Sequence, residues 1–114
     1  MDEARLASGL WVSAYLARLG LEGIPAHVVR RGDATAGAVA VKLATMDGRA
    51  SLFTRSYRLS GVLGWDETLA AESEATVDQA LARARARDPD LWIIEVEDPK
   101  GRHRLDAPGL GGED

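Results

Sequence analysis

The stretch Leu91–Asp98, LWIIEVED, has the sequence of a central strand. Its first half is apolar on both faces of an extended chain, which is typical of a strand at the centre of a sheet. Residues 98–101, Asp-Pro-Lys-Gly, then predict a turn, because Pro and Gly supply backbone angles that turns need. Residues 102–105 predict a last strand that returns beside the central one.

An acidic run, Glu95–Asp98, ends this central strand. Its carboxylates could hold a hard cation. However, the acids alternate with an apolar residue, and a four-residue turn would place Glu97 opposite Arg102 and Glu95 opposite Arg104. We therefore interpret the run as half of a set of cross-strand ion pairs, and we expect no metal.

Residues 74–87 predict a helix that leads into the central strand. Its apolar side chains recur at helical spacing and form a narrow stripe of Val77, Leu81 and Ala84. Ser73 is the expected N-cap, and acids at the start with arginines at the end complement the helix dipole. If the chain crosses over through this helix, one pair of strands is parallel.

Three upstream runs, residues 26–30, 38–45 and 50–59, predict strands. Asp47-Gly48 predicts a tight turn between the last two, which makes a hairpin whose register the sequence leaves open. Residues 65–71 predict a fourth strand, although their alternation is imperfect and a loop remains an alternative.

Residues 9–21 predict a helix that precedes all the strands. The apolar stripe expected at helical spacing consists of Leu10, Ala14, Ala17 and Leu21, flanked by Trp11 and Tyr15. Ser8 is the expected N-cap, and Pro25 blocks continuation of the helix.

These elements follow the order α-β-β-β-β-α-β-β. We expect an α+β fold, a two-layer sandwich in which a mostly antiparallel sheet of about five or six strands carries both helices on one face. Residues 1–105 form a single domain in this interpretation, and residues 106–114 form a flexible acidic tail.

Composition excludes several classes of function. The chain has no cysteine, so disulfide frameworks, thiolate catalysis and cysteine-based zinc sites are excluded, and a cytoplasmic location is expected. The net charge of −4 and the pI near 5.1 argue against nucleic acid as a partner. Neither a signal peptide nor a membrane-spanning run is recognisable, so we expect no membrane partner; we also expect no cofactor.

The candidate functional site is the loop between the strands at 26–30 and 38–45. Its glycine spacing, G-x-x-x-x-G from Gly32 to Gly37, resembles a phosphate-binding loop, but the Lys, Ser/Thr and helix that should follow are missing. Backbone amides and two guanidinium groups remain, which suit a phosphate or carboxylate. The candidate ligand-binding residues are Arg30, Arg31, Gly32, Asp33, Thr35 and Gly37.

A simpler interpretation of the same loop is the bend of a hairpin, and turn chemistry alone favours it. In that interpretation Asp33 makes an Asx-turn and the glycines take positive φ. Catalysis has no recognisable signature elsewhere: His27 and His103 are far apart in sequence and show no metal-ligand spacing. We interpret both histidines as ordinary surface or half-buried residues. The sequence therefore leaves enzymatic activity open and leans against it.

Three segments, GLWVSAYLARL (9–19), RGDATAGAVAVKL (31–43) and DPDLWIIEVED (88–98), together resemble a family of small bacterial proteins. That family is catalogued only as a domain of unknown function, numbered fourteen ninety-one. The likeness runs from about Leu6 to Pro108 and is loose around residues 63–73. It implies a cytosolic bacterial protein that stands alone at this size, and it brings no activity, cofactor or catalytic residue.

Two functions from different classes follow. The favoured one is a non-enzymatic protein-interaction or assembly module, with a homodimer as one form, because an outer sheet face or edge strand can pair with another chain. The alternative is a binder of a small anionic ligand, bearing phosphate or carboxylate, at the loop from Arg30 to Gly37. Arg55 and Arg58 would contribute if the hairpin brings them near.

Overall fold

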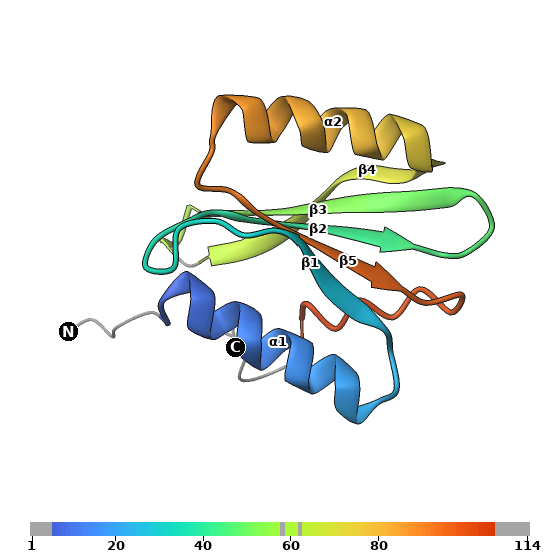
Figure 1. The fold of residues 1–114 in the computed structure, drawn as a ribbon, viewed down its shortest axis with the longest axis horizontal. Helices are drawn as coiled ribbons and strands as arrows, with labels where there is room; N and C mark the ends of the chain where they lie inside the picture. The colour runs from blue at the N-terminus through green and yellow to red at the C-terminus, as the bar shows by residue number, and fades with distance from the viewer. Residues whose placement is uncertain (1–5, 58, 62, 107–114) are drawn as a thin grey trace.

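The structure, a computed structural model, describes residues 6–57, 59–61 and 63–106. It is an α+β fold with one five-stranded mixed sheet and one helix on each face of that sheet (Figure 1). The strand order is β1-β5-β2-β3-β4. The elements are α1 (Ser8–Leu21), β1 (Ala26–Arg30), β2 (Val39–Ala44), β3 (Arg49–Tyr57), β4 (Leu63–Ser73), α2 (Glu74–Arg87) and β5 (Trp92–Glu97).

β5 lies in the interior of the sheet, as its apolar sequence predicts. It pairs antiparallel with β1 and parallel with β2, so the expected parallel pair is present. Ile94 and Val96 on one face and Ile93 on the other are all buried. A strand that is buried on both faces needs a cover on each side, and this requirement explains the arrangement of the helices.

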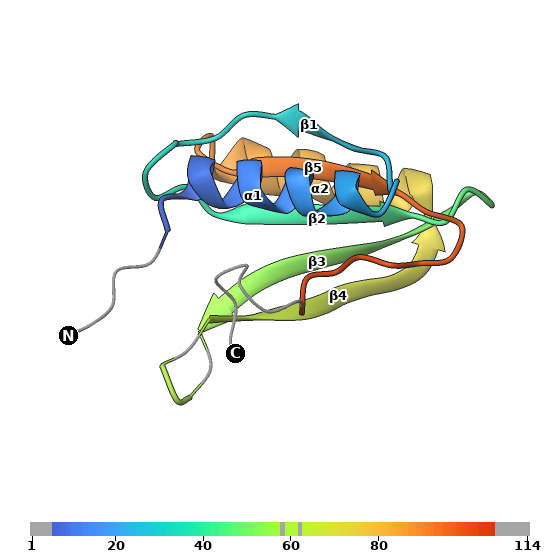
Figure 2. The same cartoon turned by 90° about the horizontal axis from the view of Figure 1, so that it is seen from below.

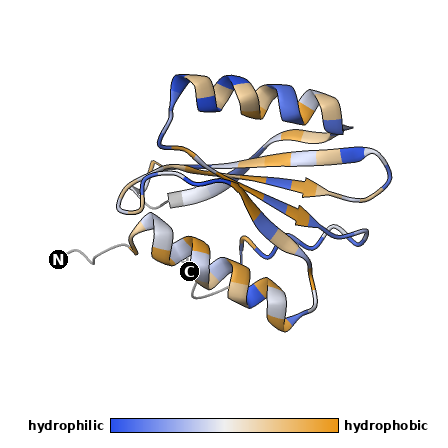
Figure 3. Ribbon diagram, in the orientation of Figure 1, coloured by the Kyte–Doolittle hydropathy of each residue, from blue (hydrophilic) through white to orange (hydrophobic). Residues whose placement is uncertain are grey.

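The helices pack on opposite faces of the sheet, so the prediction that both lie on one face is wrong. Val39, Val41 and Leu43 of β2 belong to the cluster that includes α1, whereas Ala40 belongs to the cluster that includes α2. Since side chains alternate along a strand, the two clusters lie on opposite faces. Figure 3 shows hydrophobic residues along β2 and β5 between the two helices.

The buried face of α1 differs from the predicted stripe. Trp11, Tyr15 and Leu19 are buried, whereas Leu10 is 58% exposed and Leu21 is 87% exposed. The rings of Trp11 and Tyr15 stack with their centroids 4.9 Å apart. Large aromatic side chains bury more apolar area than leucine, so they determine which way the helix faces.

α2 follows its prediction. Ser73 accepts a hydrogen bond from the amide of Thr76 at 3.1 Å, which confirms the N-cap. Val77 and Leu81 are buried and Ala84 packs against the same cluster. The stripe on this helix has no aromatic competitor, so helical spacing alone identifies its buried face.

The β2–β3 hairpin is confirmed, and Ala44 pairs with Ala50. Its turn is longer than the tight turn expected, because Thr45 and Arg49 close it; positive φ falls at Met46 and Gly48 and not at Asp47. The Asp47 carboxylate accepts hydrogen bonds from the Thr45 hydroxyl at 2.7 Å and the Arg49 amide at 3.1 Å. Residues 65–71 are confirmed as a strand within the longer β4.

Residues 102–105 do not form the predicted last strand. The segment crosses β3 and β4 on the α1 side of the sheet (Figure 2). The Tyr15 hydroxyl donates to the His103 carbonyl at 2.7 Å, the His103 ring lies 4.6 Å from that of Phe53, and Leu105 is buried. Here the segment covers apolar surface that α1 leaves open. It packs on the face of the sheet and does not pair with an edge as a sixth strand.

The predicted cross-strand ion pairs are also absent among the described residues. Arg102 instead pairs with Asp98 at 2.7 Å, and Arg104 pairs with Glu22 at 2.8 Å. Of the predicted acidic tail, 106–114, all but Asp106 lies outside the described residues. In the part of the chain that is described, no helix is long and apolar enough to cross a membrane.

We predict that Asp98→Asn lowers the free energy of unfolding at pH 7 by about 2 kcal/mol, the scale of a charge-assisted hydrogen bond. The Asp98 carboxylate is 3% exposed and accepts hydrogen bonds from the Arg102 guanidinium and from the amides of Lys100 and Arg102. The guanidinium, with the two amides, holds the pKa of Asp98 well below its usual range. Urea unfolding between pH 7 and pH 2 measures the effect.

The lowered pKa of Asp98 determines how the stability of the protein changes with pH. A carboxyl whose pKa is depressed by folding contributes stability above its unfolded pKa of about 3.9, and this contribution is lost as the pH falls below that value. The wild type should therefore lose more stability on acidification than Asp98→Asn, with the exposed Asp106→Asn as a neutral control. Parallel pH profiles for the wild type and Asp98→Asn would contradict the prediction.

Candidate functional site

The loop between β1 and β2 does not bend a hairpin, because β5 lies between these strands. It passes close to the carbonyl oxygen of Asp90, with which a Cβ at Gly32 or Gly37 would collide. A Cβ at Gly32 would also lie 2.7 Å from the amide nitrogen of Trp92. Neither glycine has positive φ, so the loop needs them for close approach and not for a left-handed backbone.

The Asx-turn expected at Asp33 is present. Its carboxylate accepts hydrogen bonds from the amides of Thr35 at 3.2 Å and Ala36 at 2.8 Å. The amide of Asp33 donates to the Asp90 carbonyl, and the amide of Gly37 donates to the Asp33 carbonyl. Four loop amides are thus already engaged within the chain, and anion binding by the loop backbone stays a prediction.

The same loop caps α1. The amides of Ser8 and Gly9 donate to the carbonyls of Thr35 and Ala34 at 3.2 and 2.8 Å. The predicted N-cap role of Ser8 is wrong, because its hydroxyl donates to the Gly37 carbonyl at 2.6 Å. Loop carbonyls therefore satisfy two of the free amides of the first helical turn, those of Ser8 and Gly9.

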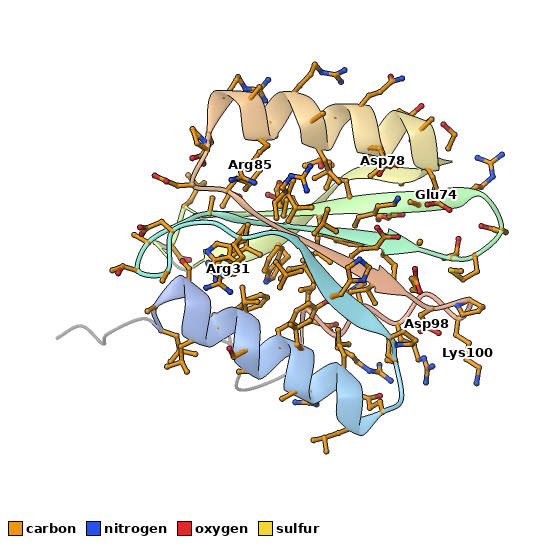
Figure 4. All side chains as sticks on the ribbon, in the orientation of Figure 1. Arg31, Glu74, Asp78, Arg85, Asp98 and Lys100 are labelled. Carbon is orange, nitrogen blue, oxygen red and sulfur yellow. The ribbon has the colours of Figure 1, made fainter. Side chains whose placement is uncertain are left out.

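The two arginines before the loop diverge. The Arg31 guanidinium lies 5.2 Å from the centroid of the Trp92 ring, and the Trp92 side chain belongs to the α1 face (Figure 4). Arg30 instead lines a groove on the α2 face. Arg55 stacks on Trp11 and Trp65, and Arg58 lies outside the described residues. The predicted cluster of arginines is therefore distributed over two faces of the sheet.

The histidines also separate. His27 is exposed and pairs with Glu95 across β1 and β5, whereas His103 packs on Phe53 on the α1 face. Within the described ranges, no group of three or more histidine, aspartate or glutamate side chains is arranged to hold a metal ion.

A site-like feature on the α2 face is a groove between α2 and the strands β1 and β5, with a volume of about 530 Å³. It arises because α2 packs over β2, β3 and β4 and leaves part of β1 and β5 uncovered. The lining is half apolar and half charged: Val29, Leu81, Ala82, Ala86 and Ile93, with Arg30, Lys42, Asp78, Arg85 and Glu95. We call this feature the α2 groove.

A β-bulge turns Arg30 into the α2 groove. Val28 pairs with Ile94 on the α1 face, and Arg30 pairs with Ile93 on the α2 face, with a register shift between them. In a regular strand, Arg30 would share the face of Val28, two residues earlier. The extra residue at Val29 re-aims the arginine, a use of bulges that is common beside functional sites.

Arg30 pairs with Ile93, and Arg85 lies in the last turn of α2, just before the chain enters β5; both arginines line the groove. The Arg85 Nε donates to the Pro89 carbonyl at 3.0 Å, and the Arg30 Nη1 donates to the Val29 carbonyl at 3.1 Å. Among the described residues, neither guanidinium pairs with a carboxylate. Figure 4 shows Arg85 directed from α2 towards the sheet.

Lys42 lies at the other end of the groove, among three carboxylates. Its ammonium lies 2.8 Å from Glu74, 2.9 Å from Asp78 and 3.8 Å from Glu95, and its side chain is 5% exposed. Burial lowers the pKa of Lys42, but the hydrogen bonds to Glu74 and Asp78 and the charge of Glu95 outweigh burial and raise it. These carboxylates therefore favour the protonated ammonium form of Lys42, and an ammonium group is not nucleophilic.

Sequence reasoning identified Arg30 but missed Lys42 and Arg85 as groove residues. A signal for Lys42 was present, since it is one charged side chain in the otherwise apolar run VAVKLA. Acids in the first turns of the next helix, Glu74 and Asp78, were its natural partners. For Arg85, no local signal distinguishes it from Arg83 or Arg87 on the same helix.

We predict that Gly32→Ala destabilises the protein by about 3 kcal/mol, because the added methyl group has to displace backbone atoms of Asp90 and Trp92. Gly20→Ala is the matched control. No atom lies within 4 Å of a Cβ at Gly20 in α1, so this change should leave stability unchanged or raise it by up to about 1 kcal/mol. Chemical denaturation compares the two, and equal stability of both variants would contradict the packing argument.

Comparison with known proteins agrees with this fold. Residues 6–106 match the model of a family described as "Protein of unknown function (DUF1491)". No curated protein matches the chain. The chain is similar to a DUF1491 family protein from Caulobacter crescentus CB15, whose crystal structure gives 40% identity, a TM-score of 0.81 and coverage of 88% of this chain and 94% of that one.

The NMR structure of a DUF1491 family protein from the same organism gives 39% identity, a TM-score of 0.79 and coverage of 90% and 94%. Protein Atu0922 from A. tumefaciens is 29% identical, with a TM-score of 0.73 and coverage of 82% of this chain and 86% of that one. The family model spans most of the sequence, and the solved relatives share the fold over nearly their whole length. The chain therefore belongs to the DUF1491 family.

Proposed function

We propose that the protein binds a small organic anion in the α2 groove. Arg30 and Arg85 hold the anionic group, and Val29, Leu81 and Ile93 contact an apolar body. The observation that carries the proposal is the pair of guanidinium groups, free of carboxylate partners among the described residues, at one end of a half-apolar groove. A volume of about 530 Å³ falls within the 300–1,000 Å³ typical of small-molecule sites.

The local electrostatics favour an anion at this end. α2 ends nearby at Arg87, and the carbonyl end of a helix carries about half a negative charge. The two positive charges of Arg30 and Arg85 outweigh this partial negative charge. Guanidinium groups also present paired N–H donors that match the two oxygens of a carboxylate or phosphate.

We propose binding without turnover. The groove lining contains no hydroxyl or thiol side chain, and its one amine, on Lys42, is held as an ammonium by carboxylates. The groove residues present are suited to recognising charge and apolar surface. The sequence also suggested anion binding as an alternative function, but at the loop between β1 and β2. The proposal here places the anion in the α2 groove, and Arg30 belongs to both candidate sites.

A protein-interaction module, the other function expected from the sequence, stays a prediction. Its motive was an open sheet face or edge strand, and both edge strands, β1 and β4, carry register shifts. Bulges of this kind disfavour pairing with another chain. The groove therefore gives the anion-binding role more direct support.

We predict that sodium octanoate raises the melting temperature of the wild-type protein by several degrees. A ligand at about 100 times its Kd stabilises the native state by roughly 2.7 kcal/mol. Arg85→Gln should raise the Kd for octanoate about tenfold or more, since it removes a charge-assisted contact worth about 1.5–3 kcal/mol. Arg83→Gln, an exposed arginine of α2 outside the groove, is the matched control and should leave the Kd unchanged.

Isothermal titration calorimetry on the same variants gives the Kd directly. An unchanged Kd in Arg85→Gln would overturn the groove as the site. If binding is instead lost in Arg31→Ala and kept in Arg85→Gln, the anion binds at the loop that the sequence first indicated. If the wild type binds neither octanoate nor octyl phosphate nor 8-aminooctanoate, the proposed function is overturned.

A further inference from the structure

Resting on the proposed function, we infer that the ligand of the α2 groove is a zwitterion. Its anionic group lies at Arg30 and Arg85, and its ammonium group lies at Asp78 and Glu95. The ligand class is an amino-carboxylic acid with an apolar chain between its two charges, or a short peptide with free termini.

The first support is the surplus of negative charge around Lys42. Three carboxylates, of Glu74, Asp78 and Glu95, lie within 4 Å of its single ammonium group. Two negative charges are therefore left without a cation in this cluster. Asp78 keeps one oxygen beyond the one that Lys42 contacts, and its side chain is 58% exposed, so it is accessible from the groove.

Glu95 gives the second support. Its side chain is only 20% exposed and lines the groove, and its carboxylate lies 3.8 Å from the Lys42 ammonium. At that distance the ammonium does not donate a hydrogen bond to it, and no other described residue does so. A largely buried carboxylate is stabilised by donors, and a ligand ammonium supplies three of them.

The third support is the spacing of the charges. Arg85 follows Asp78 by seven residues on α2, which corresponds to about 10 Å along the helix. On the sheet, Arg30 pairs with Ile93, and Glu95 lies two residues further along β5, about 7 Å away. The two sides of the groove therefore agree in direction, with cations at the Ile93 end and acids at the Glu95 end.

The surface between the two charged ends is apolar. Leu81 and Ala82 lie between Asp78 and Arg85 along α2, and Ile93 of β5, beside Arg30, lines the groove with them. An extended tripeptide spans about 10 Å. A tripeptide with an apolar central side chain, or a linear amino acid of similar length, thus places both charges and its apolar part against matching surfaces.

The test compares ligands that differ in one charge or in length, by isothermal titration calorimetry on the full chain. We expect 8-aminooctanoate to bind about tenfold more tightly than octanoate, the ratio for one added charge-assisted contact. 4-Aminobutyrate should show no gain over butyrate, because it is too short to reach both ends. Among peptides, Ala-Leu-Ala should bind more tightly than its N-acetylated form by a similar ratio.

Variants locate the ammonium. Glu95→Gln keeps the volume of the side chain and should reduce the advantage of 8-aminooctanoate over octanoate to about twofold or less. The matched control is Glu97→Gln, on the same strand but outside the groove lining, which should keep the tenfold advantage. Each variant is judged by the ratio of its Kd values for the two ligands. A modest change in the stability of the protein affects both Kd values alike and leaves this ratio unchanged.

The outcomes separate the two proposals. If octanoate binds as tightly as 8-aminooctanoate and acetylated peptide as tightly as free peptide, the zwitterion is overturned while anion binding stands. If neither octanoate nor any zwitterion binds, both proposals fail. A gain for the free tripeptide alone identifies a peptide ligand, and a gain for 8-aminooctanoate alone identifies a linear amino acid; either supports the zwitterion.

Discussion

β5 hydrogen-bonds to β1 on one side and to β2 on the other, and most of the architecture follows from that position. Its side chains are buried on both faces, so apolar cover is required above and below the sheet. α1 supplies one cover and α2 supplies the other. Because α2 packs over β2, β3 and β4, parts of β5 and β1 stay uncovered on that face, and they form the floor of the α2 groove.

The Lys42 cluster fixes α2 against this floor. Glu74 and Asp78 lie one turn apart on the helix, and Glu95 belongs to the strand next to Lys42. Ion pairs to a buried ammonium group such as that of Lys42 contribute little net stability, since its desolvation offsets most of the attraction. Here the ion pairs fix the position of α2 relative to the sheet. One ammonium group, on β2, contacts carboxylates of both α2 and β5. The width of the groove depends on that position.

Much of the fold could be predicted from local signals. The Ser73 cap, the Val77–Leu81 stripe and the apolar run of β5 each encode their outcome within a few residues. Local signals could not predict on which face of the sheet each helix packs. An apolar stripe shows which side of the helix is buried, but it does not show which face of the sheet buries it. The burial of Trp11 and Tyr15 over Leu10 shows the same limit within one helix.

The candidate site was partly predictable for a related reason. Arg30 was identified by its sequence neighbours, but its face depends on a bulge at Val29 that no residue type demands. The missing last strand has a similar cause: Arg104 takes positive φ, and tertiary contacts of His103 and Leu105 outweigh strand pairing. Sites assembled from β1, β2, β5 and α2 depend on contacts between distant segments, which local patterns do not specify.

The position of β5 also has a consequence for the order in which the protein folds during synthesis. Of the five strands of this sheet, β5 is the last to leave the ribosome, yet it lies between the strands β1 and β2, which are made long before it. Until residues 92–97 emerge, the β2–β3–β4 meander has an unpaired inner edge and β1 has no partner. Such long-range closure slows folding and leaves an open edge exposed in the nascent chain, where a chaperone or a second copy can pair with it. The completed fold conceals that edge only when the C-terminal part of the chain has arrived.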